Sequence, residues 1–417
     1  MILEHASKRV NGARLLDRIF SLAEVGAIEG GGVCRLALTD DDKAGRDLVV
    51  AWMHELDLDV HIDAIGNVVA VRHGKNPALA PVMTGSHIDT VRTGGKYDGN
   101  YGVLAGLEVL ETLSAANIST ERAIAVAFFT DEEGARFHPD MMGSLVYAGG
   151  MTVEDALDLP GIDGTRLGDE LNRIGYAGPV PCPGIVPHAF VELHVEQGPV
   201  LEAEGITIGV VERVQGISWQ EVTITGQSNH AGTTPMRMRH DAGFAAAHLA
   251  VRVREIVLDA GADQVGTVGS IRLHPDLINV VAARAVLTID LRNTDNDALT
   301  RVEAEVAAAA QEIAQSQGVT VTSRSSARFA PVDFDPRIID LVEAVALAHG
   351  NSQRRMPSGA GHDAQMIARM CPTGMIFVPS ARGLSHNVAE YTHPDDLEAG
   401  ANVLLHVLMA LANEADT

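Results

Sequence analysis

The chain has 417 residues, of which 46% are hydrophobic and 21% charged, and its formal net charge is −24. This length predicts two domains, each large enough to bury a core, and the composition is typical of a soluble globular protein. The negative charge would repel nucleic acid and anionic membranes, so we expect neither a nucleic acid partner nor a membrane partner.

The three cysteines, Cys34, Cys182 and Cys371, are too few and too scattered for a disulfide framework or a Cys-rich zinc site. The amino-terminal 25 residues lack an apolar core long enough for a signal peptide, and no stretch approaches the length of a membrane span. We therefore expect a reduced, cytoplasmic protein.

In the first part of the chain, helix and strand signals alternate. Apolar residues recur at helical spacing over residues 11–26, 43–56 and 102–115. Strand patterns cover residues 60–62, 68–71, 81–84 and 123–130. This alternation predicts an α/β fold.

The pattern changes near Arg213. Signals in the order β-α-β-β-α-β then cover residues 219–225, 241–258, 266–273, 280–291, 298–315 and 319–324. This is the split, ferredoxin-like arrangement. Helices over 336–348 and 364–370 and a strand over 375–378 then resume the first style. We predict a discontinuous domain, residues 1–212 and 330–417, with an inserted domain, residues 213–329.

The first candidate site residues follow the strand over residues 81–84. His87 and Asp89 come where that strand ends, and Asp98 lies on a Gly-flanked turn. Open α/β sheets bind ligands at strand ends, and imidazole with carboxylate is a ligand set for divalent metals. The sequence therefore indicates a metal site, and with it a hydrolase.

Other candidates follow other strands. Glu132 and Glu133 come after the strand over 123–130, His194 lies on an alternating strand, and His386 follows the last strand. Taken singly, the two acids fit a solvated turn or a helix cap, His194 a structural group and His386 an exposed loop. Adjacent carboxylates also suit a division of labour, in which one binds metal and the other moves a proton.

Two glycine-containing loops complete the set. Residues 358–364 form a turn with free amide groups, but they lack the lysine and the spacing of a phosphate loop. His230 lies in the inserted unit, on the loop between its first strand and first helix.

The order of these features over almost the whole chain resembles the M20 metallopeptidase and amidohydrolase superfamily. Four strings resemble its hydantoinase/carbamoylase branch, which contains N-carbamoyl-L-amino-acid hydrolases, allantoate amidohydrolases and β-ureidopropionases. The strings are Gly85-Ser86-His87-Ile88-Asp89-Thr90, Glu192-Leu193-His194-Val195-Glu196-Gln197-Gly198-Pro199, Asn229-His230-Ala231-Gly232-Thr233-Thr234-Pro235 and Gly359-Ala360-Gly361-His362-Asp363-Ala364.

The resemblance implies a central mixed sheet flanked by helices, as in zinc peptidases, and an inserted domain that serves as a lid and forms a homodimer. It also implies two divalent ions per subunit, which could be Mn²⁺, Co²⁺, Ni²⁺ or Zn²⁺. Asp98 would bridge the ions, and the other ligands would be His87, His194, Glu133 and His386. Asp89 would orient His87 through its ring N–H, and Glu132 would be the general base.

For the substrate, the resemblance implies that His230 donates to the oxyanion, either in its own subunit or in the partner's. Arg292 would hold a carboxylate. Gln197, Asn279 and the amides around Gly361 would hold the ureido and carboxylate ends, and His362 would support a ligand or touch the substrate.

The activity implied is hydrolysis of an N-carbamoyl-L-amino acid to the amino acid, ammonia and CO₂. The alternatives are an allantoate amidohydrolase, which releases ureidoglycine, ammonia and CO₂, and a β-ureidopropionase, both of which need the same motifs. A dipeptidase is a more distant alternative, which the strings at residues 196–199 and 361–363 disfavour. A binding protein that has lost catalysis would lack a ligand or the base, and none is missing.

Overall fold

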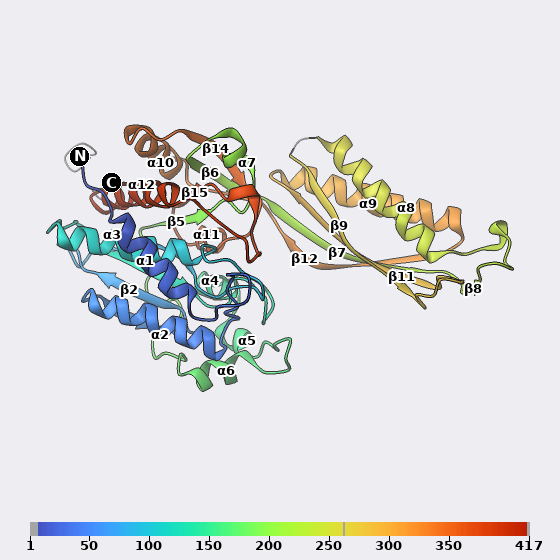
Figure 1. The fold of residues 1–417 in the computed structure, drawn as a ribbon, viewed down its shortest axis with the longest axis horizontal. Coiled ribbons are helices and arrows are strands. Elements are labelled where there is room, and N and C mark those ends of the chain that lie inside the picture. The colour runs from blue at the N-terminus through green and yellow to red at the C-terminus, as the bar shows by residue number, and fades with distance from the viewer. Residues whose placement is uncertain (1–6, 262, 415–417) are drawn as a thin grey trace. The chain divides into compact units, whose positions relative to one another are not determined.

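The computed structural model describes residues 7–261 and 263–414. Contacts between Cα atoms divide the chain into two units, one within residues 1–212 and 334–417 and the other within residues 213–333. Both ends of the chain therefore belong to the first unit, and the second unit is an insertion in its sequence (Figure 1).

A mixed sheet, nine-stranded among the described residues, forms the core of the first unit. Its order is β1, β2, β4, β3, β5, β15, β6 and β13, with β14 paired to β6. Strand β3 runs parallel to β4 and β5, and β5 runs parallel to β15. The strands are β1 (Asp59–Ile62), β2 (Val68–Arg72), β3 (Val82–His87), β4 (Ile124–Phe129), β5 (Ala189–Val195), β6 (Ile208–Val214), β13 (Val332–Asp333), β14 (Gln353–Ser358) and β15 (Thr373–Val378).

Helices pack against this sheet. Both α3 and α12 contact β3 and β5, whereas α4 contacts β4 and α11 contacts β15. The mixed sheet with flanking helices confirms the predicted fold class of this part of the chain. The helices are α1 (Gly12–Ala23), α2 (Asp40–Glu55), α3 (Asn100–Ala115), α4 (Met142–Tyr147), α5 (Val153–Leu157), α6 (Leu167–Ile174), α7 (Val200–Glu204), α10 (Pro336–Ala348), α11 (Asp363–Ile367) and α12 (Pro394–Ala412), with a 3-10 turn η2 (Ala381–Gly383).

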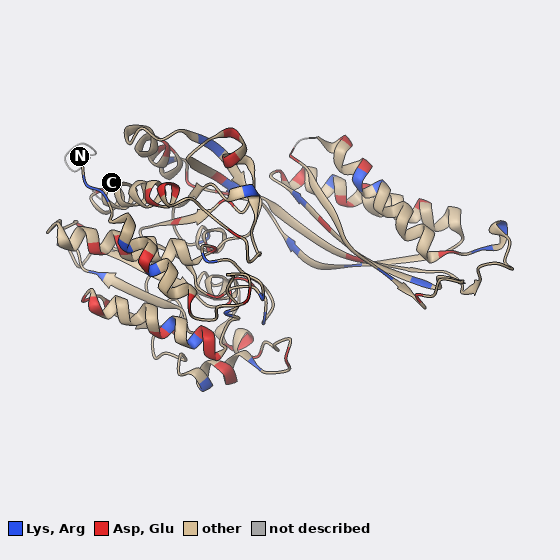
Figure 2. Ribbon diagram, in the orientation of Figure 1, with Lys and Arg blue, Asp and Glu red and all other residues tan. Residues whose placement is uncertain are grey.

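Charge and capping explain where α2 begins. The Thr39 side chain accepts the N–H of Asp42, and three aspartates occupy the first turn, where the helix dipole favours negative charge. This acidic first turn is visible in Figure 2. The helix expected over 364–370 ends earlier, at Ile367, because residues 369 and 370 donate to the carbonyls three residues back and form turns.

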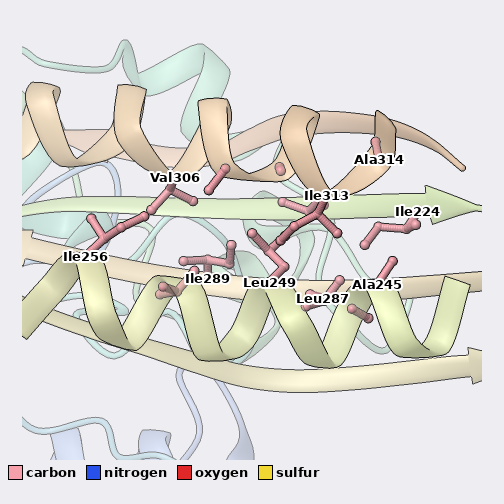
Figure 3. Close-up of a cluster of buried hydrophobic side chains, with 14 of the residues drawn as sticks. Ile224, Ala245, Leu249, Ile256, Leu287, Ile289, Val306, Ile313 and Ala314 are labelled. Carbon is pink, nitrogen blue, oxygen red and sulfur yellow. The ribbon is translucent and has the colours of Figure 1, made fainter. Parts of the chain in front are cut away.

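The second unit contains a four-stranded antiparallel sheet in the order β12, β7, β11, β9, and helices α8 and α9 pack on it. Along the chain this gives the expected β-α-β-β-α-β order. Figure 3 shows Leu249 of α8 and Val306 of α9 among the apolar side chains that pack with Leu287 of strand β11. The elements are β7 (Gly216–Thr225), α8 (Ala242–Ala260), β9 (Val265–His274), β11 (Arg284–Asn293), α9 (Asn296–Gln317) and β12 (Thr320–Phe329).

The single strand expected over 280–291 is two strands, β10 (Val280–Val281) and β11. It breaks because β10 leaves the sheet and pairs with β8 (Asn229–His230), while Ala282 and Ala283 accept hydrogen bonds from Ala242 and Gly226. A 3-10 turn, η1 (Met236–Met238), follows β8.

Two further observations concern the whole described chain. None of the helices within residues 7–261 and 263–414 has the length and apolar character needed to cross a bilayer. The three cysteines are free thiols.

Candidate metal and catalytic site

His87, Asp98 and His194 meet where two neighbouring strands end. Strands β3 and β5 are parallel, so their carboxyl ends lie at the same edge of the sheet. Both histidines are only 1% exposed. Asp98 Oδ1 lies 3.2 Å from His194 Nε2 and 3.6 Å from His87 Nε2. The ligand atoms of these three side chains all lie within 4.8 Å of one another.

Asp98 belongs to a second group through its other oxygen. His386 Nε2 lies 3.5 Å from Asp98 Oδ2 and 3.1 Å from Glu133 Oε2. These three ligand atoms also lie within 4.8 Å of one another. Asp98 thus presents one oxygen to each group, as a carboxylate must if it is to bridge two cations.

The turn that carries Asp98 requires a glycine at its next position. Gly99 has a φ of +65°, and a Cβ there would lie 2.3 Å from His87 Nε2. The Gly99 N–H donates to His194 Nε2 at 3.1 Å. The close approach of this turn to both histidines therefore depends on the missing side chain.

The two buried histidines are oriented as metal ligands. His87 Nδ1 donates to the carbonyl of Asp89 at 3.0 Å, and His194 Nδ1 donates to the carbonyl of Val195 at 2.8 Å. Each Nδ1 therefore carries a proton, so the neutral form of each ring has its lone pair on Nε2, the ring nitrogen nearest Asp98.

The field at this point favours a cation. Burial alone would lower the pKa of His87, but the charges of Glu132, Asp89 and Glu133 and the hydrogen bond to Asp98 raise it well above its usual value. Burial would likewise raise the pKa of Asp98, but contacts with His194 and His87 hold it well below the usual range. Residues that fit a divalent ion in ligand type, orientation and charge thus converge here.

Glu132 lies beside the first group but outside it. Its Oε2 is 3.4 Å from His87 Nε2, and the residue is 8% exposed. Burial raises the pKa of Glu132 well above its usual value; the His87 charge opposes this, and neighbouring acids such as Asp363 and Glu133 reinforce it. A buried carboxylate beside the ligand groups with a raised proton affinity is suited to take up a proton from water.

Asp89 contacts His87 differently from the expectation. Its main-chain carbonyl, not its carboxylate, accepts the Nδ1 proton, and its Oδ1 is 3.9 Å from that nitrogen. The carboxylate instead accepts the N–H groups of Glu132 and Glu133, at 3.2 and 3.3 Å. The turn after β3 brings the main-chain carbonyl of Asp89 back to the His87 ring. The Asp89 carboxylate is therefore left to hold the main chain of Glu132 and Glu133.

Three residues assigned to substrate also lie in the first unit. Gln197 has a φ of +58° and donates from Nε2 to Asp98 Oδ2 at 2.8 Å. His362 packs against His194, with ring centroids 4.6 Å apart, and its Nε2 is 2.9 Å from Ser358 Oγ. Gly361 lies against Met141, which a Cβ would meet at 2.8 Å. Gln197 and His362 therefore contact the ligand groups directly.

Three further side chains, Ser385, Glu390 and Glu192, make polar contacts that sequence reasoning missed. Ser385 Oγ donates to Asp98 Oδ2 at 2.8 Å. Glu390 accepts the N–H groups of Tyr97 and Asp98. Glu192 accepts from Ser86 Oγ and from the N–H of Ala364. The position of Ser385 beside His386 was a signal for the first, but nothing in the spacing connects Glu390 with a turn 292 residues away.

The second unit holds His230, Asn279 and Arg292. The first two are adjacent, since β8 pairs with β10 and the Ala231 N–H donates to the Asn279 carbonyl at 2.9 Å. His230 Nδ1 accepts the N–H groups of Gly232 and Thr233, so neutral His230 carries its proton on Nε2. Arg292 lies at the opposite end of β11, with its guanidinium on Asp290 at 2.9 Å.

Comparisons with known proteins agree on the kind of protein. The profile of Peptidase family M20/M25/M40 matches residues 83–410. An N-carbamoyl-L-amino-acid amidohydrolase of Rhizobium meliloti is 41% identical over 97% of this chain and 98% of its own length. An allantoate amidohydrolase of Bacillus subtilis is 35% identical over 95% and 97%. A hydantoinase/carbamoylase family amidase structure from Burkholderia multivorans is 46% identical, with a TM-score of 0.94 over 98% and 99%.

Proposed function

Since the chain belongs to peptidase family M20/M25/M40, we propose that it hydrolyses the carbamoyl C–N bond of N-carbamoyl-L-amino acids. The products are the L-amino acid, ammonia and CO₂. The observation that carries the proposal is the Asp98 carboxylate between two groups of metal-ligating side chains, with Glu132 beside them. The similarity to an N-carbamoyl-L-amino-acid amidohydrolase along the whole chain supports this substrate over allantoate.

Two divalent ions would be held by the two groups. His87, His194 and Asp98 would hold the first, and Asp98, Glu133 and His386 the second. When bound, the ions would polarise the ureido carbonyl and lower the pKa of water. Imidazole and carboxylate ligands accept Mn²⁺, Co²⁺, Ni²⁺ or Zn²⁺, so availability decides among them.

The proton transfers fall to Glu132. Its raised pKa suits it to take a proton from the attacking water and to return that proton to the leaving nitrogen. Asp89 keeps Glu132 in place by accepting its main-chain N–H. Gln197 and His362, which line the ligand groups, would orient the ureido end, with the amides around Gly361.

The second unit would supply His230 and Arg292. With its proton on Nε2, His230 is a hydrogen-bond donor suited to the charge that develops on the carbonyl oxygen. Arg292 would bind the substrate carboxylate, in exchange for its contact with Asp290. Asn279 beside His230 would add a polar contact.

The positions of His230 and Arg292 within this unit support a homodimer. Arg292 and Arg284 are eight residues apart on β11, which corresponds to about 26 Å. His230 lies beyond the Arg284 end, where β8 pairs with β10 (Figure 1). The carboxylate and ureido groups of the substrate are only a few bonds apart. One copy cannot bring both side chains to one substrate, so we infer that His230 acts in the partner's site.

Exposed apolar side chains in the second unit support the same assembly. Phe244, Val251 and Leu258 recur every seven residues along α8 and are 56, 56 and 68% exposed. Strand β9 is an edge strand and exposes Ile271 and Leu273. We propose that α8 and β9 form the interface with a second copy.

The remaining expectations concern the cell. The net charge of −24 supports a protein without a nucleic acid partner, and the free thiols fit a reducing compartment. We therefore propose that the enzyme acts in the cytoplasm.

Ammonia release from a substrate panel tests the activity. The panel contains N-carbamoyl-L-amino acids, N-carbamoyl-β-alanine, allantoate and dipeptides, each with added Mn²⁺, Co²⁺, Ni²⁺ or Zn²⁺. The highest kcat/KM is expected for an N-carbamoyl-L-amino acid. A higher value for allantoate would transfer the assignment to that substrate, and cleavage of dipeptides alone would overturn the ureido assignment.

A further inference from the structure

The turn that carries Asp98 is held from outside the ligand groups by one buried carboxylate. Glu390 Oε1 accepts the N–H of Tyr97 at 3.0 Å and that of Asp98 at 3.1 Å. Glu390 is 6% exposed. Its side-chain hydrogen bonds within the described residues go to the main chain of this turn and to no substrate candidate, so the function proposed above leaves this side chain unexplained.

Glu390 is also fixed relative to His386. Its own N–H donates to the Asn387 carbonyl at 2.9 Å, and the Ala389 N–H donates to Asn387 Oδ1 at 2.9 Å. These bonds close a tight turn directly after His386, which itself has a φ of +54°. Glu390 therefore links the turn with Asp98 to the turn with His386, two segments nearly 300 residues apart.

The main chain at Gly95 lies directly against the Glu390 side chain. A Cβ at Gly95 would lie 2.2 Å from both Cδ and Oε1 of Glu390. Gly95 thus lets the carboxylate reach the two N–H groups. Any side chain at this position would displace the carboxylate.

We infer that Glu390 is a positioning residue that directs the Asp98 carboxylate toward the second ion, and this inference rests on the proposed two-ion site. The first group keeps two histidines anchored on β3 and β5 without Glu390. In the second group, Asp98 and His386 meet only through turns, and Glu390 joins those turns. Loss of an outer contact of this kind lowers metal affinity about 10- to 100-fold.

The test is titration of the metal-free protein with Mn²⁺ by calorimetry, which reports the number of ions and each affinity. The wild-type chain is expected to bind two ions. Glu390→Ala should lower the affinity for the second ion about 10- to 100-fold and the affinity for the first ion only a few-fold. Glu390→Gln should bind both within a few-fold of wild type, because its amide oxygen can accept the same two N–H bonds.

Gly95→Ala provides a second route, because it displaces the carboxylate without removing it. It should lower the affinity for the second ion as much as Glu390→Ala does. The double variant Gly95→Ala/Glu390→Ala should show no further loss of affinity. Glu108→Ala is the matched control: Glu108 is buried and accepts the Asn11 N–H, but it lies away from the ligands, so only the melting temperature should fall.

The outcomes separate the two proposals. If Glu390→Ala and Gly95→Ala both bind two ions as tightly as wild type, Glu390 has no positioning role. A wild-type protein that binds fewer than two ions would instead contradict the two-ion site of the proposed function.

Discussion

The two units present their candidate residues in opposite ways. In the first unit, His87, Asp98 and His194 are at most 4% exposed, and both histidine Nδ1 atoms and Asp98 Oδ2 have fixed hydrogen-bond partners. His386, a ligand of the second group, is the exposed member of this set, with 51% of its side chain exposed. In the second unit, His230 is exposed and its neighbourhood includes Ile278 and Met236, which are 104 and 77% exposed.

This difference shows that the metal ligands and the proposed substrate donor His230 belong to different units. Buried ligands with fixed tautomers bind ions without further rearrangement, so the first unit can assemble its metal site from its own residues. His230 is exposed, and none of the candidate ligand groups among the described residues includes a residue of the second unit. The proposed function therefore has His230 act on ligand groups outside the second unit.

The largest expected effect concerns the buried unit. Glu132→Gln should lower kcat about 10²- to 10⁴-fold, because the amide cannot take the proton from water. Metal content should remain that of wild type, since Glu132 lies outside both ligand groups. Steady-state rates and metal analysis of the purified variant measure both quantities.

Glu133→Gln is the control for Glu132, because it changes the adjacent glutamate in the same way. It should lose affinity for the second ion, whose ligand groups include Glu133. If Glu132→Gln kept a rate near wild type, the proton transfer would belong to another residue, and the site of the first unit would lack its base.

The next effect tests whether the exposed unit acts on a partner. His230→Ala should lower kcat about 10²- to 10³-fold with unchanged metal content, since it removes one oxyanion donor. Co-expression of His230→Ala with Glu132→Gln should restore about a quarter of wild-type activity. Half of the dimers are then mixed, and one of their two sites contains both residues.

As the control, His230→Ala and Glu132→Gln are purified separately and mixed under conditions in which subunits do not exchange. This mixture should show no recovery of activity. No recovery in co-expressed dimers would mean that His230 acts within its own subunit. The first unit would then complete its site without a second copy.

The fold was predictable where periodicity is local. The β-α-β-β-α-β order emerged because α8 and α9 each have a buried apolar face that recurs at helical spacing, with strand patterns between them. Helix α12 was missed, since its residues are buried on nearly all sides and show no amphipathic period. The break between β10 and β11 was missed because it depends on pairing with the distant β8.

The site was predictable as a set of residue types and not as a set of contacts. Motifs identified His87, Asp98 and Glu132 because strand ends and glycine turns mark them in sequence. They could not show that Asp89 uses its carbonyl on His87 and its carboxylate on the glutamates, since both contacts depend on the turn geometry. The contacts of Glu390 with the turn at Asp98 could not be predicted for the same reason.

A smaller effect concerns the proposed interface of the exposed unit. Val251→Glu places a charge in the middle of the apolar residues of α8 and should raise the dimer dissociation constant about 100-fold or more. Sedimentation over a concentration series measures it. Val186→Glu, with the same 56% exposure but in the first unit, should leave the dimer unchanged. Unchanged assembly of Val251→Glu would place the interface elsewhere.

The smallest effect is expected at Cys34, which precedes the buried residue Arg35. Arg35 is fully buried and donates to the Ile88 carbonyl and to Asn100 Oδ1, each at 2.8 Å. Cys34 is half-buried, and it is the main-chain N–H of Cys34 that holds this segment, by donating to the Gly26 carbonyl at 2.8 Å. Cys34→Thr should therefore change kcat/KM less than about twofold. A large loss would mean that the thiol itself supports the neighbouring Arg35 contacts with Ile88 and Asn100.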